Sequence, residues 1–278
     1  MAVDAIGLKN EKMNSKEKLG IVIFTCDKYA DLWDAFFHFF NKFWPDCPYP
    51  IYLATNSKLV TYKNVAPLYS NQLSTWGKET LAAVSQYSLD YFIYFQEDYF
   101  LTQKVNNEEL KLLFSKMLHL KADYLRLFPS PGADRKMTNE KDFGEISTTA
   151  KYRTSLQCSI WKTETFKTLL RPDESSWEFE LNSPKRSFNF LFLSVFSQSK
   201  WKLKRTNYPI NYYYMTAIYK GKWLKPPLNK CIKEGITPDL AYRKVESTWN
   251  YIYRKFYHIS PLFARHFLDF LNTKIERK

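Results

Sequence analysis

The chain has 278 residues, of which 45% are hydrophobic and 18% aromatic, and its formal net charge is +13. A chain of this length and composition can bury a sizeable core, which excludes a disordered protein. The positive charge points to nucleic acid, an anionic membrane surface or phosphorylated small molecules as partners, or else serves solubility alone.

Several classes of enzyme lack their motifs in this sequence. Neither GxGxxG nor GxxxxGK[ST] occurs, and there are only 7 glycines. No CxxC, HxxxH or GxSxG is present, so zinc sites and hydrolase triads have no support. The four separated cysteines fit reduced cytosolic thiols. Because residues 1–18 are polar and no apolar run reaches 18 residues, we expect a cytoplasmic protein.

The first half of the chain predicts alternating strands and helices. Leu19–Thr25 is an uncharged run rich in β-branched residues, typical of a buried strand. A helix should follow, with Leu32 to Phe43 supplying one apolar face, and it should end at Pro45. Ile51–Thr55 then predicts a second strand, so the two strands should pair in parallel through a right-handed crossover.

The alternation continues to about residue 128. Ser74 or Thr75 can cap a helix that leads to a strand at Tyr91–Phe95. Asn107 can cap another helix, and Tyr124–Phe128 has strand composition. The pattern predicts a layered α/β domain.

Beyond Pro129 the rhythm changes, and Pro129–Ala150 is predicted as a loop or weak hairpin. The remaining predicted elements are a strand at Leu156–Trp161, a short helix at Thr163–Leu170, a helix opening with Trp177–Glu180 after the cap Ser176, a strand at Tyr208–Met215 and a helical segment after Pro238.

Two adjacent carboxylates, Glu97 and Asp98, stand where the Tyr91–Phe95 strand should emerge from the sheet. Ligands collect at the carboxyl ends of strands in open α/β sheets. Hard oxygen ligands there suit Mg²⁺ or Mn²⁺ bridging a substrate's phosphates. The alternative is that both residues are simply solvated at a strand end.

Three further groups could carry chemistry. Thr25-Cys26-Asp27 ends the first strand, where Asp27 could bind a base or ribose hydroxyl or could serve as a cap or turn residue. Trp177-Glu178-Phe179-Glu180 offers a general base, although on a helix the two carboxylates would point about 200° apart and only one could face a site. Both could instead be surface residues.

The third group is Tyr219-Lys220-Gly221-Lys222-Trp223. Its lysines could neutralise a leaving diphosphate or could form an ordinary basic turn.

Taken in order, these pieces resemble bacterial glycosyltransferases of capsule and lipopolysaccharide assembly with a GT-A-type fold. The resemblance covers roughly residues 19–225. It rests on IVIFTCDKYADLW (Ile21–Trp33), FWPDCPYPIYLATN (Phe43–Asn56), YFIYFQEDYFL (Tyr91–Leu101), DYLRL (Asp123–Leu127), YRTSLQCSIWK (Tyr152–Lys162), RPDESSWEFE (Arg171–Glu180) and KGKW (Lys220–Trp223).

The resemblance implies a mainly parallel, GT-A-like sheet flanked by helices, a nucleotide-sugar donor and a divalent metal, Mn²⁺ or Mg²⁺. Asp98 and Glu97 would hold the metal, although Gln96 stands where related enzymes show another acid. The remaining roles it implies are donor binding by Thr25, Asp27, Trp76, Glu97 and Lys222, with Lys222 at the diphosphate, and general-base catalysis by Glu178 or Glu180.

The expected organisation is a polar tail at residues 1–18, a catalytic domain at 19–230 and a basic, aromatic helical segment at 231–278. That last segment could lie on an anionic membrane surface or could pack back onto the domain. We expect an inverting transfer to a glycan or lipid-linked acceptor in surface polysaccharide assembly, at the inner face of the cytoplasmic membrane and without nucleic acid. The alternative function is a non-catalytic nucleic-acid- or membrane-surface-binding protein.

Overall fold

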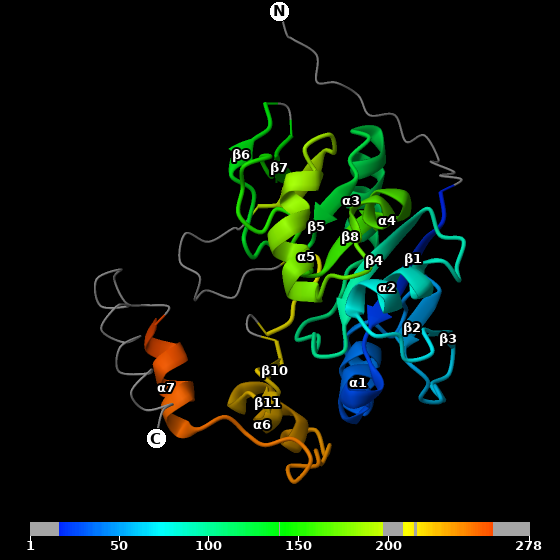
Figure 1. Cartoon of the computed structure of the whole chain (residues 1–278). Coiled ribbons are helices and arrows are strands. Elements are labelled where there is room, and N and C mark those ends of the chain that lie inside the picture. The colour runs from blue at the N-terminus through cyan, green and yellow to red at the C-terminus, as the bar shows by residue number, and fades with distance from the viewer. Residues whose placement is uncertain (1–16, 139, 197–207, 214–215, 258–278) are drawn as a thin grey trace, which may run out of the picture. The chain divides into compact units, whose positions relative to one another are not determined.

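The computed structural model describes residues 17–138, 140–196, 208–213 and 216–257 (Figure 1). These residues divide into two compact units that alternate along the chain. The first unit draws on residues 1–27, 46–96 and 105–211, and the second on residues 28–45, 97–104 and 212–278. The expected boundary near residue 230, between a catalytic domain and a C-terminal segment, stays a prediction.

The first unit contains a 9-stranded sheet with the strand order β3-β2-β1-β4-β8-β5-β9-β7-β6. Its strands are β1 (Leu19–Phe24), β2 (Ile51–Thr55), β3 (Val65–Tyr69), β4 (Tyr91–Gln96), β5 (Tyr124–Arg126), β6 (Arg135–Lys136), β7 (Phe143–Glu145), β8 (Ser159–Lys162) and β9 (Phe192–Val195). Most strands run in one direction, and β8 and β7 run against their neighbours. The predicted α/β class with a mixed, mainly parallel sheet is confirmed.

The helices of the first unit cover both faces of this sheet. They are α2 (Trp76–Val84), α3 (Asn107–His119), α4 (Thr163–Leu169), α5 (Ser176–Asn182) and the 3₁₀ helix η2 (Ser183–Arg186). One face carries a core in which Phe24, Phe92 and Trp161 pack with Phe166 of α4 and Phe179 of α5. The other face meets α3, where the rings of Tyr91 and Phe114 lie 5.2 Å apart.

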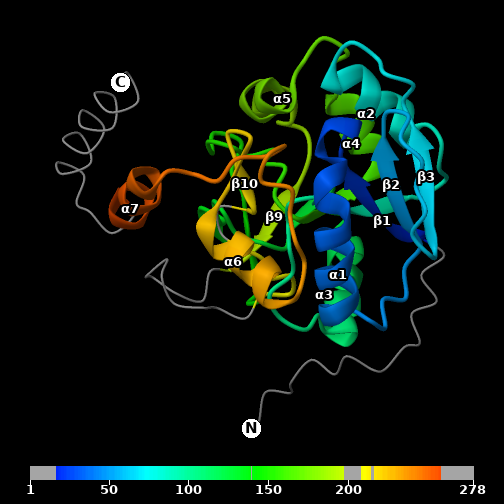
Figure 2. The ribbon, with the colours of Figure 1, turned by 90° about the horizontal axis from the view of Figure 1, so that it is seen from below.

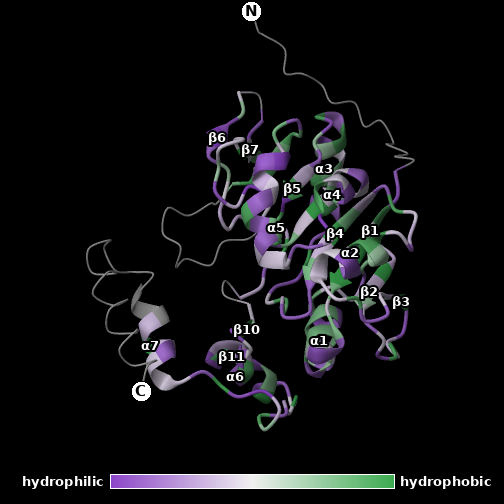
Figure 3. Ribbon diagram, viewed as in Figure 1, coloured by the Kyte–Doolittle hydropathy of each residue, from purple (hydrophilic) through white to green (hydrophobic). Residues whose placement is uncertain are grey.

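The central strands form because their residues are apolar on both faces. All six residues of β1 are buried, and five of the six in β4. Figure 3 shows β1 in hydrophobic colouring. Such runs suit a strand with covered faces rather than one facing water.

The second unit, described by itself, contains most of the 3₁₀ helix η1 (Asp27–Leu32), α1 (Trp33–Phe43), the hairpin β10 (Ile218–Tyr219) and β11 (Lys222–Trp223), α6 (Lys225–Lys233) and α7 (Thr248–Tyr257). Arg243 holds it together through two hydrogen bonds of 2.8 Å to the Asp31 carboxylate. Phe39 of α1 packs on Phe100, whose ring lies 6.0 Å from that of Trp223.

Several predicted boundaries shift in the structure. Asn106 rather than Asn107 caps α3, and Ser175 rather than Ser176 caps α5, because their side chains accept the free N–H groups of the first turn. The weak hairpin is present as β6 and β7, and it joins the main sheet through β9. The predicted strand at 156–161 begins only at Ser159.

Two predictions for the end of the chain are only partly covered. Residues 214–215 lie outside the described part, and in the rest of the expected 208–215 strand only Tyr212 forms a bridge, with Leu101, so that strand prediction is wrong where it can be checked. The expected helix after Pro238 begins at Thr248 as α7, and residues 258–278 lie outside the described part. No helix among the described residues is long and apolar enough to cross a membrane.

Candidate functional site

An open pocket lies in the first unit, at the carboxyl ends of β1, β2 and β3. Figure 2 shows these three strands side by side. The pocket is lined by Phe24, Thr25, Ala54, Thr55, Ser70, Trp76, Glu79, Thr80 and Ala83. This is the edge of an open α/β sheet at which ligands bind.

Parallel pairing explains why the strand-end hydroxyls meet here. Thr25 N donates to Ala54 O at 2.9 Å, and Ser70 N donates to Thr55 O at 3.0 Å. Thr25 and Ser70 therefore each extend the backbone hydrogen-bond ladder by one residue past the end of a strand. Thr25, Thr55 and Ser70, which are far apart in sequence, thus lie at one edge of the sheet.

Helix α2 supplies the opposite wall of the pocket. Thr75 caps it by accepting Lys78 N. Gly77 N donates to Glu174 O at 2.9 Å, and a Cβ on Gly77 would lie 2.0 Å from Arg171 O, so only glycine allows this approach. The ring of Trp76 lies 5.5 Å from that of Phe179. The first turn of α2 is therefore locked against the segment that leads into α5.

A polar network stands behind the pocket. Asn56 Nδ2 donates to Glu79 Oε1 at 2.6 Å and to Ser70 Oγ at 3.4 Å. Asn56 Oδ1 accepts Asp27 N at 3.0 Å. Burial raises the pKa of Glu79, and the hydrogen bond from Asn56 opposes that rise. The Glu79 carboxylate is thus oriented by the protein and placed in the pocket wall.

Asp27 organises the loop after β2. Its carboxylate accepts Thr55 Oγ1 at 2.9 Å, Ser57 Oγ at 2.7 Å and the backbone N–H of Lys58 at 3.0 Å. Burial raises the pKa of Asp27, but these hydrogen bonds outweigh it and lower the pKa to about 2. The observed hydrogen bonds of Asp27 are those of a residue that stabilises a turn. A contact of Asp27 with a nucleoside stays a prediction.

Thr80 contributes an unusual buried hydroxyl. Thr80 is 2% exposed, and its Oγ1 has no hydrogen-bond partner within the described part of the chain. Buried polar atoms normally find a partner. A ligand group that entered the pocket could supply this one.

Glu97 and Asp98 belong to the second unit and are 8% and 9% exposed, so they are not solvated strand-end residues. Asp98 Oδ2 accepts Ile218 N at 3.4 Å, and the Asp98 carbonyl accepts Ala217 N at 2.9 Å. Burial raises the pKa of Asp98 to about 6, although hydrogen bonds from Thr216 and Ile218 oppose the rise. Asp98 Oδ1 is buried and has no hydrogen-bond partner among the described residues.

Asp98 Oδ1, which has no hydrogen-bond partner among the described residues, is suited to the role of a metal ligand. No group of three or more His, Cys, Asp or Glu side chains in the described ranges could hold a metal ion by itself. A site formed by one or two carboxylates fits Mg²⁺ or Mn²⁺, which take further oxygens from water and substrate phosphates. The Asp98 carboxylate is therefore suited to an ion that arrives with a phosphorylated ligand, and a metal contact of Glu97 stays a prediction.

Lys222 lies in the hairpin of β10 and β11, where Tyr219 pairs with Lys222. Lys220 and Gly221 between them both have positive φ, 47° and 74°, which is the conformation of a type I′ hairpin turn. Arg243 Nη1 donates to Gly221 O at 3.3 Å. The basic turn is exposed and firmly held, and its role toward a diphosphate stays a prediction.

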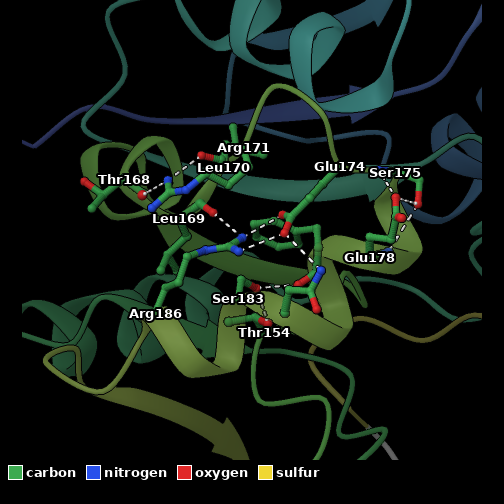
Figure 4. Close-up of polar contacts among 12 residues, drawn as sticks. Thr154, Thr168, Leu169, Leu170, Arg171, Glu174, Ser175, Glu178, Ser183 and Arg186 are labelled. Carbon is green, nitrogen blue, oxygen red and sulfur yellow. Dashed lines mark hydrogen bonds and ion pairs between the residues drawn. The ribbon is translucent and has the colours of Figure 1, made fainter.

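The two candidate bases lie on α5 and have different surroundings. Figure 4 shows the capping box in which Glu178 Oε2 accepts Ser175 N at 2.8 Å and Ser175 Oγ at 2.7 Å. These bonds lower the pKa of the exposed Glu178. Glu180 Oε1 accepts Leu156 N at 2.6 Å and Ser155 Oγ at 3.0 Å. Burial raises the pKa of Glu180 despite these bonds.

The pocket brings together only part of the predicted set. Thr25 and Trp76 line it, and Asp27 reaches it through Asn56, whereas Glu178 and Glu180 do not line it. The sequence reasoning missed Glu79 and Thr80. Their positions, three and four residues after Trp76 on the same helix, were the signal that could have found them.

Comparisons with known proteins leave the family open. No family model and no curated protein matches the chain. A structure of TarS from S. aureus is similar at 14% identity and a TM-score of 0.45, over 66% of this chain and 58% of that chain. A cytidylyltransferase from Leptospira borgpetersenii is similar at 13% identity and a TM-score of 0.45, over 66% of this chain and 77% of that chain. The match spans only 35% of a second TarS chain. At these TM-scores no activity is inferred from either likeness.

Proposed function

We propose that this chain is a glycosyltransferase that moves a sugar from a nucleotide-sugar donor to a glycan or lipid-linked acceptor in bacterial surface polysaccharide assembly. The observation that carries the proposal is the pocket at the ends of β1, β2 and β3, with its oriented carboxylate and its unpartnered hydroxyl. The motif order described for residues 19–225 supports the same class.

The pocket suits the nucleoside of such a donor. The pocket is open to solvent and its enclosed space is about 20 Å³, room for about one water molecule, so it would take up a single group of the donor rather than the whole donor. A base can pack against Trp76. Ribose hydroxyls can donate to the Glu79 carboxylate, and Thr80 Oγ1 can bond to base or sugar.

In the proposed reaction the acceptor hydroxyl oxygen bonds to the anomeric carbon of the donor sugar. The bond from that carbon to the diphosphate oxygen breaks, and the nucleoside diphosphate leaves with the electron pair. A divalent metal bound at Asp98 and Glu97 would neutralise charge on the leaving diphosphate. Lys222 would add a second positive charge there.

The acceptor's proton must pass to a base, and Glu180 and Glu178 remain the candidates. A base works best with a pKa near the working pH. The raised pKa of Glu180 supports it over Glu178, whose pKa is lowered. Glu178 is in turn the more accessible carboxylate. A single-displacement reaction with such a base inverts the anomeric carbon.

Membrane attachment is a further part of the proposal. The net charge of +13 suits a protein that meets an anionic surface carrying a lipid-linked acceptor. The basic, aromatic C-terminal segment that includes α7 would lie at that surface.

The test is a thermal-shift panel of UDP-, GDP-, CDP-, ADP- and dTDP-sugars with and without Mn²⁺. A ligand that binds only the native state stabilises it, by about 2.7 kcal/mol at 100 times its Kd. We expect one donor class to raise the melting temperature, and more so with Mn²⁺. That donor should then release nucleoside diphosphate in an acceptor-dependent assay. No shift with any donor would refute the proposal.

A further inference from the structure

Helix α5 presents an exposed tryptophan. Trp177 is 58% exposed, whereas Trp33, Trp44, Trp161 and Trp223 are at most 2% exposed. The ring of Tyr152 lies 6.0 Å from that of Trp177, at an interplanar angle of 55°. Leu181, one turn along the helix, is 47% exposed. We call Trp177, Tyr152 and Leu181 the α5 platform.

The backbone holds Tyr152 in a conformation that few aromatic residues adopt. Its φ is 52°, in the left-handed region that favours glycine and asparagine. Arg126, which is fully buried, donates from Nη2 to the Tyr152 carbonyl at 2.8 Å, and Ser155 N donates to the same oxygen at 3.1 Å. Strain that the surroundings enforce in this way is concentrated at functional sites.

The loop that carries Tyr152 is also tied to the helix that carries Trp177. Ser183 Oγ, at the start of η2 directly after α5, donates to Thr154 Oγ1 at 2.5 Å (Figure 4). Glu180 accepts Ser155 Oγ and Leu156 N. The two rings are thus set in place before any ligand arrives, which lowers the entropic cost of binding.

The charge of α5 indicates which kind of ligand the α5 platform can bind. The sequence of α5, SWEFELN, has two glutamates and no lysine or arginine, in a chain of net charge +13. Figure 3 shows this helix mostly in hydrophilic colouring. On the α5 side of the platform, the phosphates of an anionic lipid surface or nucleic acid would be repelled by Glu178, and the helix itself offers no cation to offset that repulsion. An uncharged ligand that is rich in hydroxyl groups would not be repelled.

The size of the platform excludes a stable protein interface. A large aromatic side chain buries roughly 150–250 Å² when fully covered, and these three side chains are only partly exposed. A specific protein interface needs about 800 Å² per partner. The platform alone is therefore too small for such an interface.

We propose that the α5 platform is an acceptor subsite that stacks one uncharged pyranose ring of a glycan, an assignment that rests on the proposed glycosyl transfer. The C–H hydrogens on one face of a pyranose meet the negative faces of the two aromatic rings. The ring hydroxyls at the edge can donate to the exposed Glu178 carboxylate. The same helix carries both candidate bases, and Glu178 is the exposed one that an acceptor bound here would face.

The test uses the full chain labelled with fluorotryptophan, and the Trp177 resonance is assigned from Trp177→Phe. Methyl glycosides of glucose, galactose and N-acetylglucosamine are titrated and followed by fluorine NMR where Trp177 is present, and their affinities for the wild type and every variant are measured by ligand-observed saturation-transfer NMR. Trp177→Leu keeps apolar area without an aromatic face, Trp177→Phe keeps a ring, and Leu112→Ala removes an exposed apolar side chain from α3 as a control. Donor binding is measured on every variant by thermal shift.

We expect at least one glycoside to shift the Trp177 resonance, with binding about tenfold weaker in Trp177→Leu and largely kept in Trp177→Phe and Leu112→Ala. Donor binding should be unchanged throughout. No shift with any glycoside, or equal binding by Trp177→Leu and the wild type, overturns the platform even when the donor binds. Glycoside binding without donor binding in the wild type instead refutes the transferase and the acceptor role. Binding of anionic vesicles through Trp177 overturns the choice of ligand.

Discussion

Asn56 Nδ2 donates to Glu79 Oε1 at 2.6 Å and thereby joins the end of β2 to the first turn of α2. The same side chain accepts Asp27 N, so one amide links the loop after β1 to both pocket walls. Asn56 is 9% exposed, and neither Asp27 nor Glu79 could shift without losing a part-buried hydrogen bond to it. The carboxylate of Glu79 is therefore held in one place relative to the strand ends.

Glu79→Gln should weaken donor binding with little effect on folding. The glutamine carbonyl can still accept from Asn56, so the link between β2 and α2 is kept. A ribose hydroxyl would lose a charged acceptor, and hydrogen bonds to charged groups contribute roughly 1.5–3 kcal/mol, so affinity should fall at least about tenfold. Calorimetric titration of the donor measures this. Glu108→Gln, on the exposed face of α3, is the control, and an equal loss in both variants would contradict the assignment.

Asp27→Asn should destabilise the protein in a pH-dependent manner. The folded-state pKa of Asp27 is lowered to about 2 from an ordinary 3.8. The unfolded state therefore binds the proton more readily, and the stabilising contribution is complete above about pH 4 and is lost as the pH falls towards about 2. The difference in urea midpoint between the wild type and the variant should shrink over that window. A difference that stays constant with pH would show that Asp27 acts through packing alone.

The two candidate bases can be tested without disturbing their structural contacts. Glutamine at 178 preserves a capping box, and glutamine at 180 keeps an oxygen for Ser155 and Leu156. Both variants should therefore fold normally. The variant that lacks the true base should lose roughly 10²–10⁴-fold in kcat while its donor affinity is unchanged. Normal turnover by both variants would show that neither carboxylate is the general base and that both have structural roles only.

Asp98 should link metal binding to pH. Burial raises its pKa to about 6, so the native state binds the proton more readily than the unfolded state. Stability should therefore decrease as the pH rises from about 4 to about 6. A metal needs the ionised carboxylate, so Mn²⁺ should raise the melting temperature more above pH 6 than below it.

Asp98→Asn is the matching variant. It should remove both the decrease in stability and the response to Mn²⁺, and it should cut transfer by orders of magnitude. Near-wild-type transfer by this variant in the presence of EDTA would exclude the metal role.

Elements with continuous apolar runs could be predicted from the sequence, and irregular ones could not. The strands β1 and β4 were predicted almost to the residue because both of their faces are buried. The strand β3 was missed, since Pro67 lies at its centre and interrupts a five-residue apolar run. It is an edge strand, where proline is tolerated.

The candidate site was predictable only where it lies at strand ends. Thr25 ends a recognisable predicted strand, which is why the sequence could place it at the sheet edge that lines the pocket, and its contact with a donor stays a prediction. Ser70 depends on β3 and was lost with it. Glu79 and Thr80 are interior positions of a helix, where polar residues normally face water, and only the packing of α2 over the strand ends turns them inward.

Thr80→Val tests the central claim, that the pocket at the ends of β1, β2 and β3 holds the donor nucleoside. Valine has the shape of threonine without the hydroxyl that lacks a partner, so the free energy of unfolding should rise by about 1 kcal/mol. Donor affinity should nevertheless fall about tenfold, because the ligand loses its bond to that hydroxyl. Thr163→Val, a buried threonine outside the pocket lining, is the control and should bind the donor normally. Donor binding by Thr80→Val that equals the wild type would contradict the account.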